Sequence, residues 1–266
     1  MKVGFLGAGN MGGAILRAIA GSASFETAVY EKSAERAQQA AQTAGCLVLP
    51  SVEALVAFAD VVLIAVKPVH IDALLQEIAA CGSCGSKIYI SIAAGVKIER
   101  FTAALGEVPI VRTMPNLPAL VGEGFTGIYY HNMDGEAFAE ARSEIRKIFD
   151  SCGKTAVLSS ESAIDKLISV TSSSPAYICL MIDALADGAV RAGFPRADAY
   201  LMAEQTVYGT ARYLLETGTL PAVLKDQVCS PAGTTIEAVV ALERSGLRSA
   251  VLDAMEACEK KAEGKL

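Results

Sequence analysis

Histidine and tryptophan are scarce in this sequence. Among its 266 residues there are two histidines, His70 and His131, and no tryptophan. Two histidines leave little room for a multi-histidine metal cage or for a proton relay centred on histidine. We therefore expect no metal site, and we expect any reaction to depend on a cofactor that the protein binds.

An excess of positive charge is also missing. The chain has 23 Lys and Arg against 29 Asp and Glu, a net charge of −6, so no overall positive field attracts nucleic acid or an anionic membrane. The apolar stretch 47–66 is interrupted by Pro50, Glu53 and Asp60, and the N-terminus lacks the apolar segment of a secretory leader. We expect no nucleic-acid partner, no membrane partner and a cytoplasmic location.

The seven cysteines are an odd number, and a cytoplasmic protein keeps its thiols reduced, so we expect buried thiols and not disulfides. Cys81 and Cys84 have the spacing of half a zinc site or of a redox pair. No second C-x-x-C and no nearby histidine completes such a site, and we interpret the segment as a loop.

The first part of the chain alternates short β-branched runs with Ala-rich stretches of helical spacing, the pattern of a parallel sheet covered by helices on both faces. We expect strands at 2–6, 27–30, 46–49, 61–66, 87–92 and 109–114. We expect the connecting helices at 11–20, 34–44, 52–59, 71–80 and 98–104. This is an α/β fold with a Rossmann-type, doubly wound sheet of order 3-2-1-4-5-6. A helix at 135–149 and strands at 128–131 and 154–158 complete a domain that we assign to residues 1–158.

From residue 159 the β pattern disappears, and we assign 159–266 to an all-helical domain. Its first helix is expected at 162–192, with a kink at Pro175, because proline removes an amide donor and clashes with the preceding turn. This helix is apolar on nearly all sides. We expect a second copy of the chain to cover it and so form a dimer; a self-contained bundle is the alternative.

A G-x-G-x-x-G motif separates the first expected strand from the first expected helix. It consists of Gly7, Ala8, Gly9, Asn10, Met11 and Gly12. Gly7 allows the tight turn, Gly9 lets the backbone approach a pyrophosphate, and Gly12 permits close packing of helix on strand. The helix N-terminus then faces the phosphates, which predicts a dinucleotide cofactor.

The end of the second strand bears on the choice between NADPH and NADH. Glu31 would accept hydrogen bonds from a ribose 2′-hydroxyl and repel a 2′-phosphate, which favours NADH. Lys32 and Ser33 offer a cation and a hydroxyl for a 2′-phosphate, and Glu31 could turn away to pair with a basic neighbour. We predict NADPH, with NADH as the alternative.

Three further segments end expected strands at the same edge of the sheet. The cofactor assignment extends to Ala65, Val66, Lys67 and Pro68 after the fourth strand, and to Ala93 and Ala94 after the fifth. Lys67 could instead be a solvated strand end. After the sixth strand, prolines flank Asn116 in a stiff loop suited to hold a polar group over a nicotinamide ring, and we assign Met114 and Asn116 to the substrate. A simple turn is the alternative for this loop.

Another informative segment lies in the helical domain. Ser230, Pro231, Ala232, Gly233, Thr234 and Thr235 form a turn that leads into a helix. Its free amides and hydroxyls suit a carboxylate, although an ordinary helix cap is the alternative.

Together, the glycine motif and the segments 65–68, 112–118, 175–177, 183–188 and 228–235 resemble those of pyrroline-5-carboxylate reductases over nearly the whole chain. Members of that family reduce 1-pyrroline-5-carboxylate to L-proline with NAD(P)H. They combine a Rossmann domain with a helical domain that dimerises, and five dimers often form a ring.

The resemblance implies roles for individual residues. The segment from Ser230 to Thr235, with Gly233 and Thr234, would bind the substrate carboxylate, and Thr235 would be catalytic through contact with the ring nitrogen. This segment would meet the nicotinamide of the neighbouring subunit. By position, Glu161 would also approach the substrate.

Two departures from the family pattern concern glycine positions. Ala232 stands where a second glycine is usual, and Thr171, Ser172, Ser173 and Ser174 replace a run in which serine alternates with glycine. If position 232 requires a positive φ, alanine there strains the turn.

Two other functions are compatible with the Rossmann-plus-helical plan. A 3-hydroxyacid dehydrogenase would carry a helix-borne lysine closely followed by asparagine, and Lys166 is followed by no asparagine in 167–171. A non-catalytic dimer that senses NADPH would bind the cofactor without oxidising it.

Overall fold

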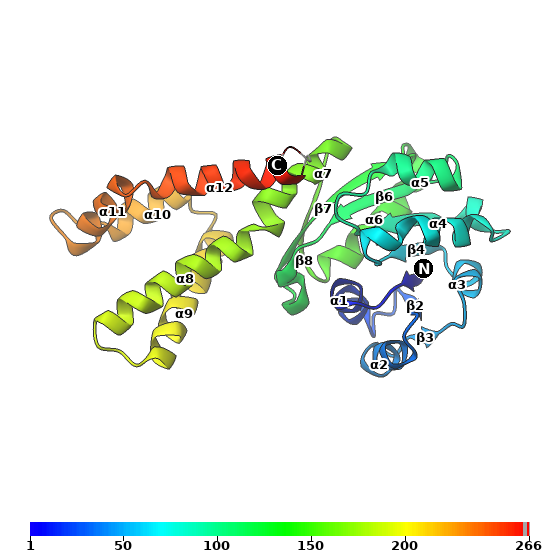
Figure 1. Ribbon diagram of the computed structural model, residues 1–266, viewed down its shortest axis with the longest axis horizontal. Coiled ribbons are helices and arrows are strands. Elements are labelled where there is room, and N and C mark those ends of the chain that lie inside the picture. Colours follow the sequence, from blue (N-terminus) through cyan, green and yellow to red (C-terminus); the bar gives the residue numbers. More distant parts are fainter. Residues whose placement is uncertain (263–264, 266) are drawn as a thin grey trace. The chain divides into compact units, whose positions relative to one another are not determined.

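The computed structural model describes residues 1–262 and residue 265. Its internal contacts divide the chain into two compact units, Met1–Ser172 and Ser173–Leu266. The first unit contains the sheet and the second is helical (Figure 1).

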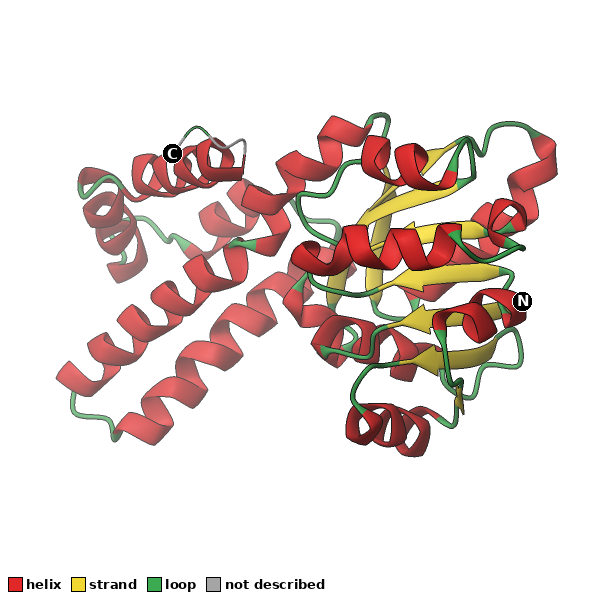
Figure 2. Ribbon diagram, turned by 45° about the vertical axis from the view of Figure 1, so that its right-hand side comes forward, coloured by secondary structure: helices red, strands yellow, loops and turns green. Residues whose placement is uncertain are grey.

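The first unit is built on a sheet, drawn in yellow in Figure 2. The sheet has eight strands in the order β3-β2-β1-β4-β5-β6-β7-β8. The strands are β1 (Lys2–Leu6), β2 (Glu26–Tyr30), β3 (Leu47–Val48), β4 (Val61–Ile64), β5 (Ile88–Ser91), β6 (Ile110–Met114), β7 (Gly124–His131) and β8 (Gly153–Val157). All neighbours from β3 to β6 pair in parallel, β7 runs antiparallel to β6, and β8 runs parallel to β7. The expected order of the first six strands is confirmed.

Helices cover both faces of this sheet, as predicted. They are α1 (Asn10–Ile19), α2 (Ala34–Ala44), α3 (Val52–Phe58), α4 (Ile71–Ala79), α5 (Ile98–Leu105), α6 (Ala139–Asp150) and α7 (Glu161–Leu167). One buried apolar cluster includes Ile15 of α1 and Ile148 of α6, and a second includes Leu55 of α3, Leu75 of α4 and Phe101 of α5. Because both faces of the sheet are covered, every residue of β4 and β6 is buried, and buried and exposed residues do not alternate along these strands.

Strand β7 begins earlier than expected. The sequence predicts a strand at 128–131, whereas the structure extends it back to Gly124. A Cβ on Gly124 would lie 2.7 Å from the Ala119 Cβ, and a Cβ on Gly127 would lie 2.1 Å from a Leu167 methyl carbon. These glycines therefore belong to the strand and allow neighbouring segments to pack closely on it.

The helical stretch after β8 is broken before Pro175. In place of one helix at 162–192, α7 is followed by a π-helical turn (Ile168–Ser172) and then by α8 (Ser174–Arg191). Pro175 lies in the first turn of α8, where its missing amide would have no partner within the helix. The predicted kink at Pro175 is therefore wrong. The helix is interrupted earlier, at Ile168–Ser172, and Pro175 lies at the start of the next helix.

The unit boundary also lies later than the expected division after residue 158. Helix α7 contacts β6, β7 and the π-helical turn, so these residues are part of the sheet unit by contact. Periodicity alone assigns α7 to the helical part because its residues continue the helical pattern.

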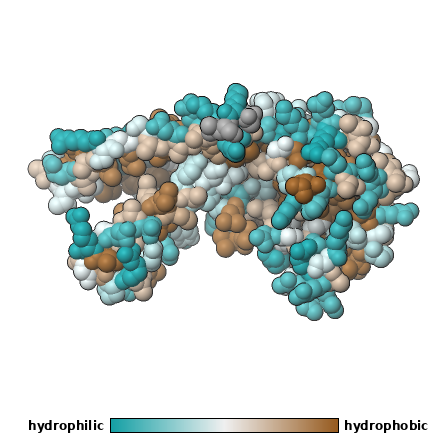
Figure 3. All heavy atoms as spheres, in the orientation of Figure 1, coloured by the Kyte–Doolittle hydropathy of each residue, from teal (hydrophilic) through white to brown (hydrophobic). Residues whose placement is uncertain are grey.

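The second unit consists of α8, α9 (Arg196–Thr217), α10 (Pro221–Val228), α11 (Thr234–Arg244) and α12 (Leu247–Ala262). Its buried apolar cluster is small and is formed by Ala186, Ala199 and Ala203, where α8 packs on α9. Larger apolar side chains are exposed in the single chain, including Leu180, Leu201 and Leu252. Figure 3 shows hydrophobic residues, in brown, at the surface among hydrophilic ones. An exposed apolar surface of this extent is typical of an interface.

The stretch Glu161–Arg191 is long and apolar enough to cross a membrane by length and composition, and 6% of its apolar window is buried within one chain. One such helix is weak evidence for a membrane span. A second copy of the chain, which the sequence predicts for this helix, would cover the same surface.

We expect the protein in solution to have at least twice the mass of one chain, measured by light scattering. Leu180 on α8 is 72% exposed, and Leu180→Glu should shift the mass towards that of one chain because it places a charge in the interface. Val69 in the sheet unit is 80% exposed, and Val69→Glu is the matched control that should leave the mass unchanged. A monomeric wild-type protein would instead support a self-contained bundle.

Candidate active site

The turn between β1 and α1 is packed tightly against the end of β4. Gly7 has a φ of +100°, and a Cβ on it would lie 2.8 Å from the Ala65 carbonyl oxygen. A Cβ on Gly12 would lie 2.6 Å from the Ala65 Cβ. Glycine at these positions therefore serves the turn and the packing, as the motif predicts.

Gly9 has no such structural reason to be glycine. Its φ of −66° suits any residue, and a Cβ on it would meet no protein atom within 4 Å. Gly9 is also the N-cap of α1, with no side-chain cap, so the first amides of α1 are left for another partner. Open space beside free helix amides fits the phosphates of a dinucleotide.

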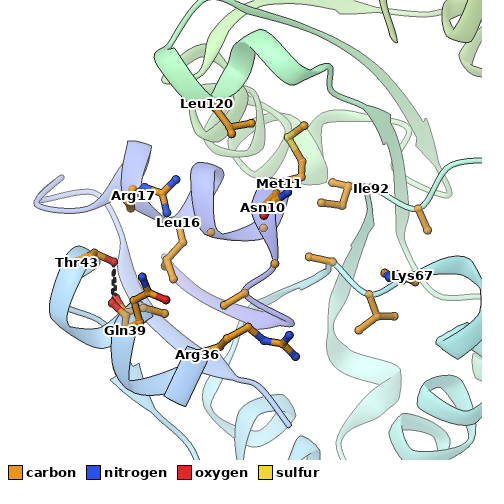
Figure 4. Close-up of a pocket in the computed structure, with 18 of the residues that line it drawn as sticks. Asn10, Met11, Leu16, Arg17, Arg36, Gln39, Thr43, Lys67, Ile92 and Leu120 are labelled. Atoms are coloured by element: carbon orange, nitrogen blue, oxygen red, sulfur yellow. Dashed lines mark hydrogen bonds between the residues drawn. The ribbon is translucent and has the colours of Figure 1, made fainter. Parts of the chain in front are cut away.

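A cavity of about 710 Å³ surrounds this helix start (Figure 4). Most of the expected cofactor residues line it, namely Ala8, Gly9, Asn10, Met11, Gly12, Ala65, Val66, Lys67, Pro68, Ala93 and Ala94. A second cavity of about 380 Å³ is lined by Gly7 and Lys32, and Gly9 and Lys67 line both. The structure thus brings together the segments that follow β1, β2, β4 and β5.

The Glu31 carboxylate holds the cofactor turn to the start of α2. Its Oε2 accepts the Ala8 amide at 3.0 Å, and its Oε1 accepts the Ser33 amide at 3.2 Å and Arg36 Nη2 at 2.7 Å. Its side chain is 8% exposed. Burial raises the pKa of Glu31, but these hydrogen bonds outweigh burial and hold the pKa below its usual value. Glu31 has therefore turned to a basic neighbour, the arrangement that the prediction of NADPH allows for.

Arg36 is a site residue that the sequence reasoning missed. It lies in α2, lines both cavities, and has a side chain that is 58% exposed. Ser33, expected to contact the cofactor, is the N-cap of α2 and accepts the Arg36 amide. The only sequence signal for Arg36 was its position in the first turn after the Glu31-Lys32-Ser33 segment.

The loop after β6 is held by the Asn116 side chain. Asn116 Nδ2 donates to the Thr171 carbonyl at 2.9 Å, and its Oδ1 accepts the Phe125 amide at 2.8 Å. Met114 is 4% exposed and belongs to β6. Within the sheet unit, the Asn116 side chain therefore joins its loop to β7 and to the π-helical turn, and the Met114 side chain lies in the core.

Glu161 is part of an ionic cluster around the buried Arg112 side chain. The Arg112 side chain on β6 is 1% exposed, and its Nη1 donates to Glu161 Oε1 at 2.9 Å. Arg112 Nη2 donates to Asp165 Oδ1 at 2.5 Å. Glu161 Oε1 also accepts the Ile98 amide at 2.7 Å. From the sequence we expect Glu161 near the substrate, and neither Arg112 nor Asp165 has a predicted role.

The turn that precedes α11 places Ala232, which stands where the family usually has glycine, at a positive φ. The Gly233 amide donates to the Ser230 carbonyl at 3.0 Å, and Ala232 has a φ of +56°. With Pro231 at the second position, this is a type II turn, whose third position favours glycine. The strain foreseen for Ala232 is therefore present, at about 1–2 kcal/mol for a left-handed alanine.

The residues after this turn open α11. Gly233 is the N-cap and has no side chain, and Thr234 and Thr235 follow as the first helical residues. Their hydroxyls make no hydrogen bond within residues 1–262 and 265. Free amides and hydroxyls at a helix start suit a carboxylate ligand.

All seven cysteines are free, but they are not all buried. Cys46, Cys81 and Cys152 are buried, whereas Cys179 is exposed. Among the residues that the structure describes, no group of three His, Cys, Asp or Glu side chains is placed to hold a metal ion.

Two glycine substitutions separate cofactor binding from folding. Gly9→Val should abolish NADPH binding, measured by fluorescence titration, while the thermal unfolding temperature changes little, because the new side chain enters open space. Gly12→Val is the contrasting control and should lower the unfolding temperature, because its side chain would collide with Ala65. Unchanged NADPH affinity in Gly9→Val would contradict a cofactor role for this cavity.

The chain matches two family models. Residues 161–265 match the model described as pyrroline-5-carboxylate reductase dimerisation. Residues 2–95 match the model described as NADP oxidoreductase, coenzyme F420-dependent.

Relatives and solved structures match over nearly the whole chain. The pyrroline-5-carboxylate reductase of Escherichia coli strain K12 is 40% identical, over 98% of this chain and 97% of that protein. A pyrroline-5-carboxylate reductase structure from Coxiella burnetii has a TM-score of 0.93 at 31% identity and covers 99% of this chain and 97% of that one. The Plasmodium falciparum pyrroline carboxylate reductase with NADP bound has a TM-score of 0.82 at 29% identity and covers 100% of this chain and 98% of that one. This chain therefore belongs to the pyrroline-5-carboxylate reductase family.

Proposed function

We propose that this chain reduces 1-pyrroline-5-carboxylate to L-proline with NADPH as the hydride donor. The observation that carries the proposal is the open cavity at Gly9, beside the uncapped start of α1, in a chain that is 40% identical to a pyrroline-5-carboxylate reductase. The NADP-bound relative supports the same cofactor class. All seven cysteines are free thiols, which suits a reducing compartment, and we place the reaction in the cytoplasm.

The residues around the two cavities would hold the cofactor. The amides at the start of α1 would bind its phosphates, and Lys67, Ala93 and Ala94 would line its path along the sheet edge. When bound, the nicotinamide supplies a hydride. Two histidines are enough for such a reaction, because a protonated cyclic imine accepts a hydride without a strong acid or base.

The preference for NADPH rests on the charges beside the second cavity. Lys32 and Arg36 are both exposed there, whereas the Glu31 carboxylate is occupied by three donors. Two exposed cations suit a 2′-phosphate, although Arg36 also pairs with Glu31, and an occupied carboxylate is a poor acceptor for a ribose 2′-hydroxyl.

The helical unit would supply the substrate site. The turn from Ser230 to Gly233 and the amides of Thr234 and Thr235 would hold the carboxylate, and the protonated ring nitrogen would donate a hydrogen bond to the Thr235 hydroxyl. As hydride reaches the imine carbon, the C=N electron pair moves to nitrogen, which keeps its proton. Asn116 would act by holding its loop, and Met114 by packing beneath that loop.

We propose that two chains complete one site. The helical unit matches a dimerisation model and exposes large apolar side chains, which supports a dimer. In this arrangement the turn before α11 in one subunit meets the nicotinamide of the other. A ring of five dimers is the higher assembly that we propose.

The loss of the Thr235 hydroxyl should lower kcat/KM for 1-pyrroline-5-carboxylate by about ten- to a hundredfold, the effect of one hydrogen bond to a charged group. The variant is Thr235→Val, which keeps the shape, and Thr235→Ser should restore most of the activity. The assay follows NADPH absorbance. Near wild-type turnover in Thr235→Val would remove Thr235 from the mechanism.

The same assay tests the proposed function in the wild-type protein. Absence of imine-dependent oxidation of both NADPH and NADH would overturn it. NADPH binding without any oxidation would favour a sensing dimer, and oxidation of NAD(P)⁺ by 3-hydroxyacids would favour a dehydrogenase.

Removal of the Arg36 side chain should shift the cofactor preference. Arg36→Ala removes a cation from the second cavity and frees Glu31, so the ratio of kcat/KM for NADPH to that for NADH should fall by about ten- to a hundredfold. Arg146 on α6 is a matched control, because it is similarly exposed and also pairs with a carboxylate. If Arg36→Ala and Arg146→Ala leave the ratio equally unchanged, Arg36 has no part in cofactor choice.

A further inference from the structure

We propose that Glu161 is a positioning residue for the cofactor, because it caps α5 from a distant part of the chain and thereby fixes the segment between β5 and α5. That segment, residues 92–97, carries Ala93 and Ala94 on the wall of the larger cavity. The inference rests on the proposed cofactor role of that cavity. It gives Glu161 a task other than the substrate contact that the sequence predicts.

Helix α5 has no cap of its own. Its N-cap residue, Lys97, makes no side-chain hydrogen bond to the helix start and has a side chain of the wrong charge for a helix N-terminus. Glu161, which lies 63 positions after Ile98, instead accepts the Ile98 amide at 2.7 Å. A carboxylate at this place satisfies a free amide and also opposes the positive end of the helix dipole.

Arg112 holds the Glu161 carboxylate at this place. The same oxygen, Oε1, accepts both the Ile98 amide and Arg112 Nη1. Arg112 is 1% exposed and is fixed from its other side by Asp165. A buried guanidinium requires paired carboxylates, because an unpaired buried charge is strongly unfavourable. The guanidinium thus links β6, α7 and the start of α5.

The other end of the segment is fixed within the sheet. The Ser91 hydroxyl accepts the Ala93 amide at 3.3 Å, and the Thr113 hydroxyl donates to the Ser91 carbonyl at 3.1 Å. Gly95, with a φ of +72°, makes the bend in between. Val96 is 2% exposed and also anchors the segment, so loss of the Glu161 link should displace the segment without unfolding it.

The test measures NADPH affinity by fluorescence titration in the full-length protein, without substrate. Glu161→Ala should raise the NADPH Kd by about tenfold, the lower end of the effect of one lost hydrogen bond to a charged group. Glu161→Gln keeps an oxygen that can accept the Ile98 amide, and its Kd should stay within about threefold of the wild type. Asp165→Asn is the matched control: it keeps an oxygen that can accept Arg112 Nη2, so Arg112 stays in place, it does not touch α5, and it should leave the Kd unchanged.

A rescue variant separates capping from general stability. Lys97 is exposed and has the extended backbone of an N-cap, so Lys97→Asp supplies α5 with a cap of its own. In the Glu161→Ala background, Lys97→Asp should return the NADPH Kd towards the wild-type value.

Three results would overturn the proposal. The first is an unchanged NADPH Kd in Glu161→Ala together with a raised KM for the imine, which would place Glu161 at the substrate. The second is an equal loss of affinity in Glu161→Ala and Asp165→Asn, and the third is a failure of Lys97→Asp to restore binding. Turnover of the imine by the wild-type protein tests the proposed function separately, because these titrations contain no imine.

Discussion

The close packing of the β1–α1 turn against Ala65 is the constraint on which the candidate site depends. Gly7 and Gly12 leave no room for a methyl group beside Ala65. This contact holds the start of α1 at the edge of the sheet, with its uncapped amides beside the larger cavity. Because β4 and β5 follow β1 in the sheet, the segments that leave their carboxyl ends reach the same cavity. Without that contact, the helix dipole would point elsewhere.

Buried and exposed charges have different tasks in this unit. Glu31 and Arg112 each join segments that are separate in the chain. Glu31 is paired with Arg36, and Arg112 is paired with Glu161 and Asp165. An unpaired charge would be costly at either place, and this cost holds the geometry. Arg36 and Lys32 remain exposed and are available for a ligand. Residue type alone does not separate these roles, since burial and partners decide them.

Much of the fold could be predicted from the sequence because the local signals and the tertiary structure agree. The expected order of the first six strands is confirmed, and so are the five connecting helices, with small shifts at their ends. The break at Ile168–Ser172 could not be predicted, because the helical pattern continues through it. There the Thr171 carbonyl accepts a hydrogen bond from Asn116, which lies 55 positions earlier. An interaction of that range leaves no trace in periodicity.

The sequence by itself determined the glycine turn, the strand order and the family to which these motifs point. These follow from local backbone geometry and from alternating patterns along the chain. Tertiary structure alone decided that Glu31 pairs with Arg36, that Asn116 holds a loop, and that Glu161 meets both Arg112 and the start of α5. The physical reason is that a polar side chain can satisfy its hydrogen bonds with many partners, and only the packed chain selects which of them comes within reach.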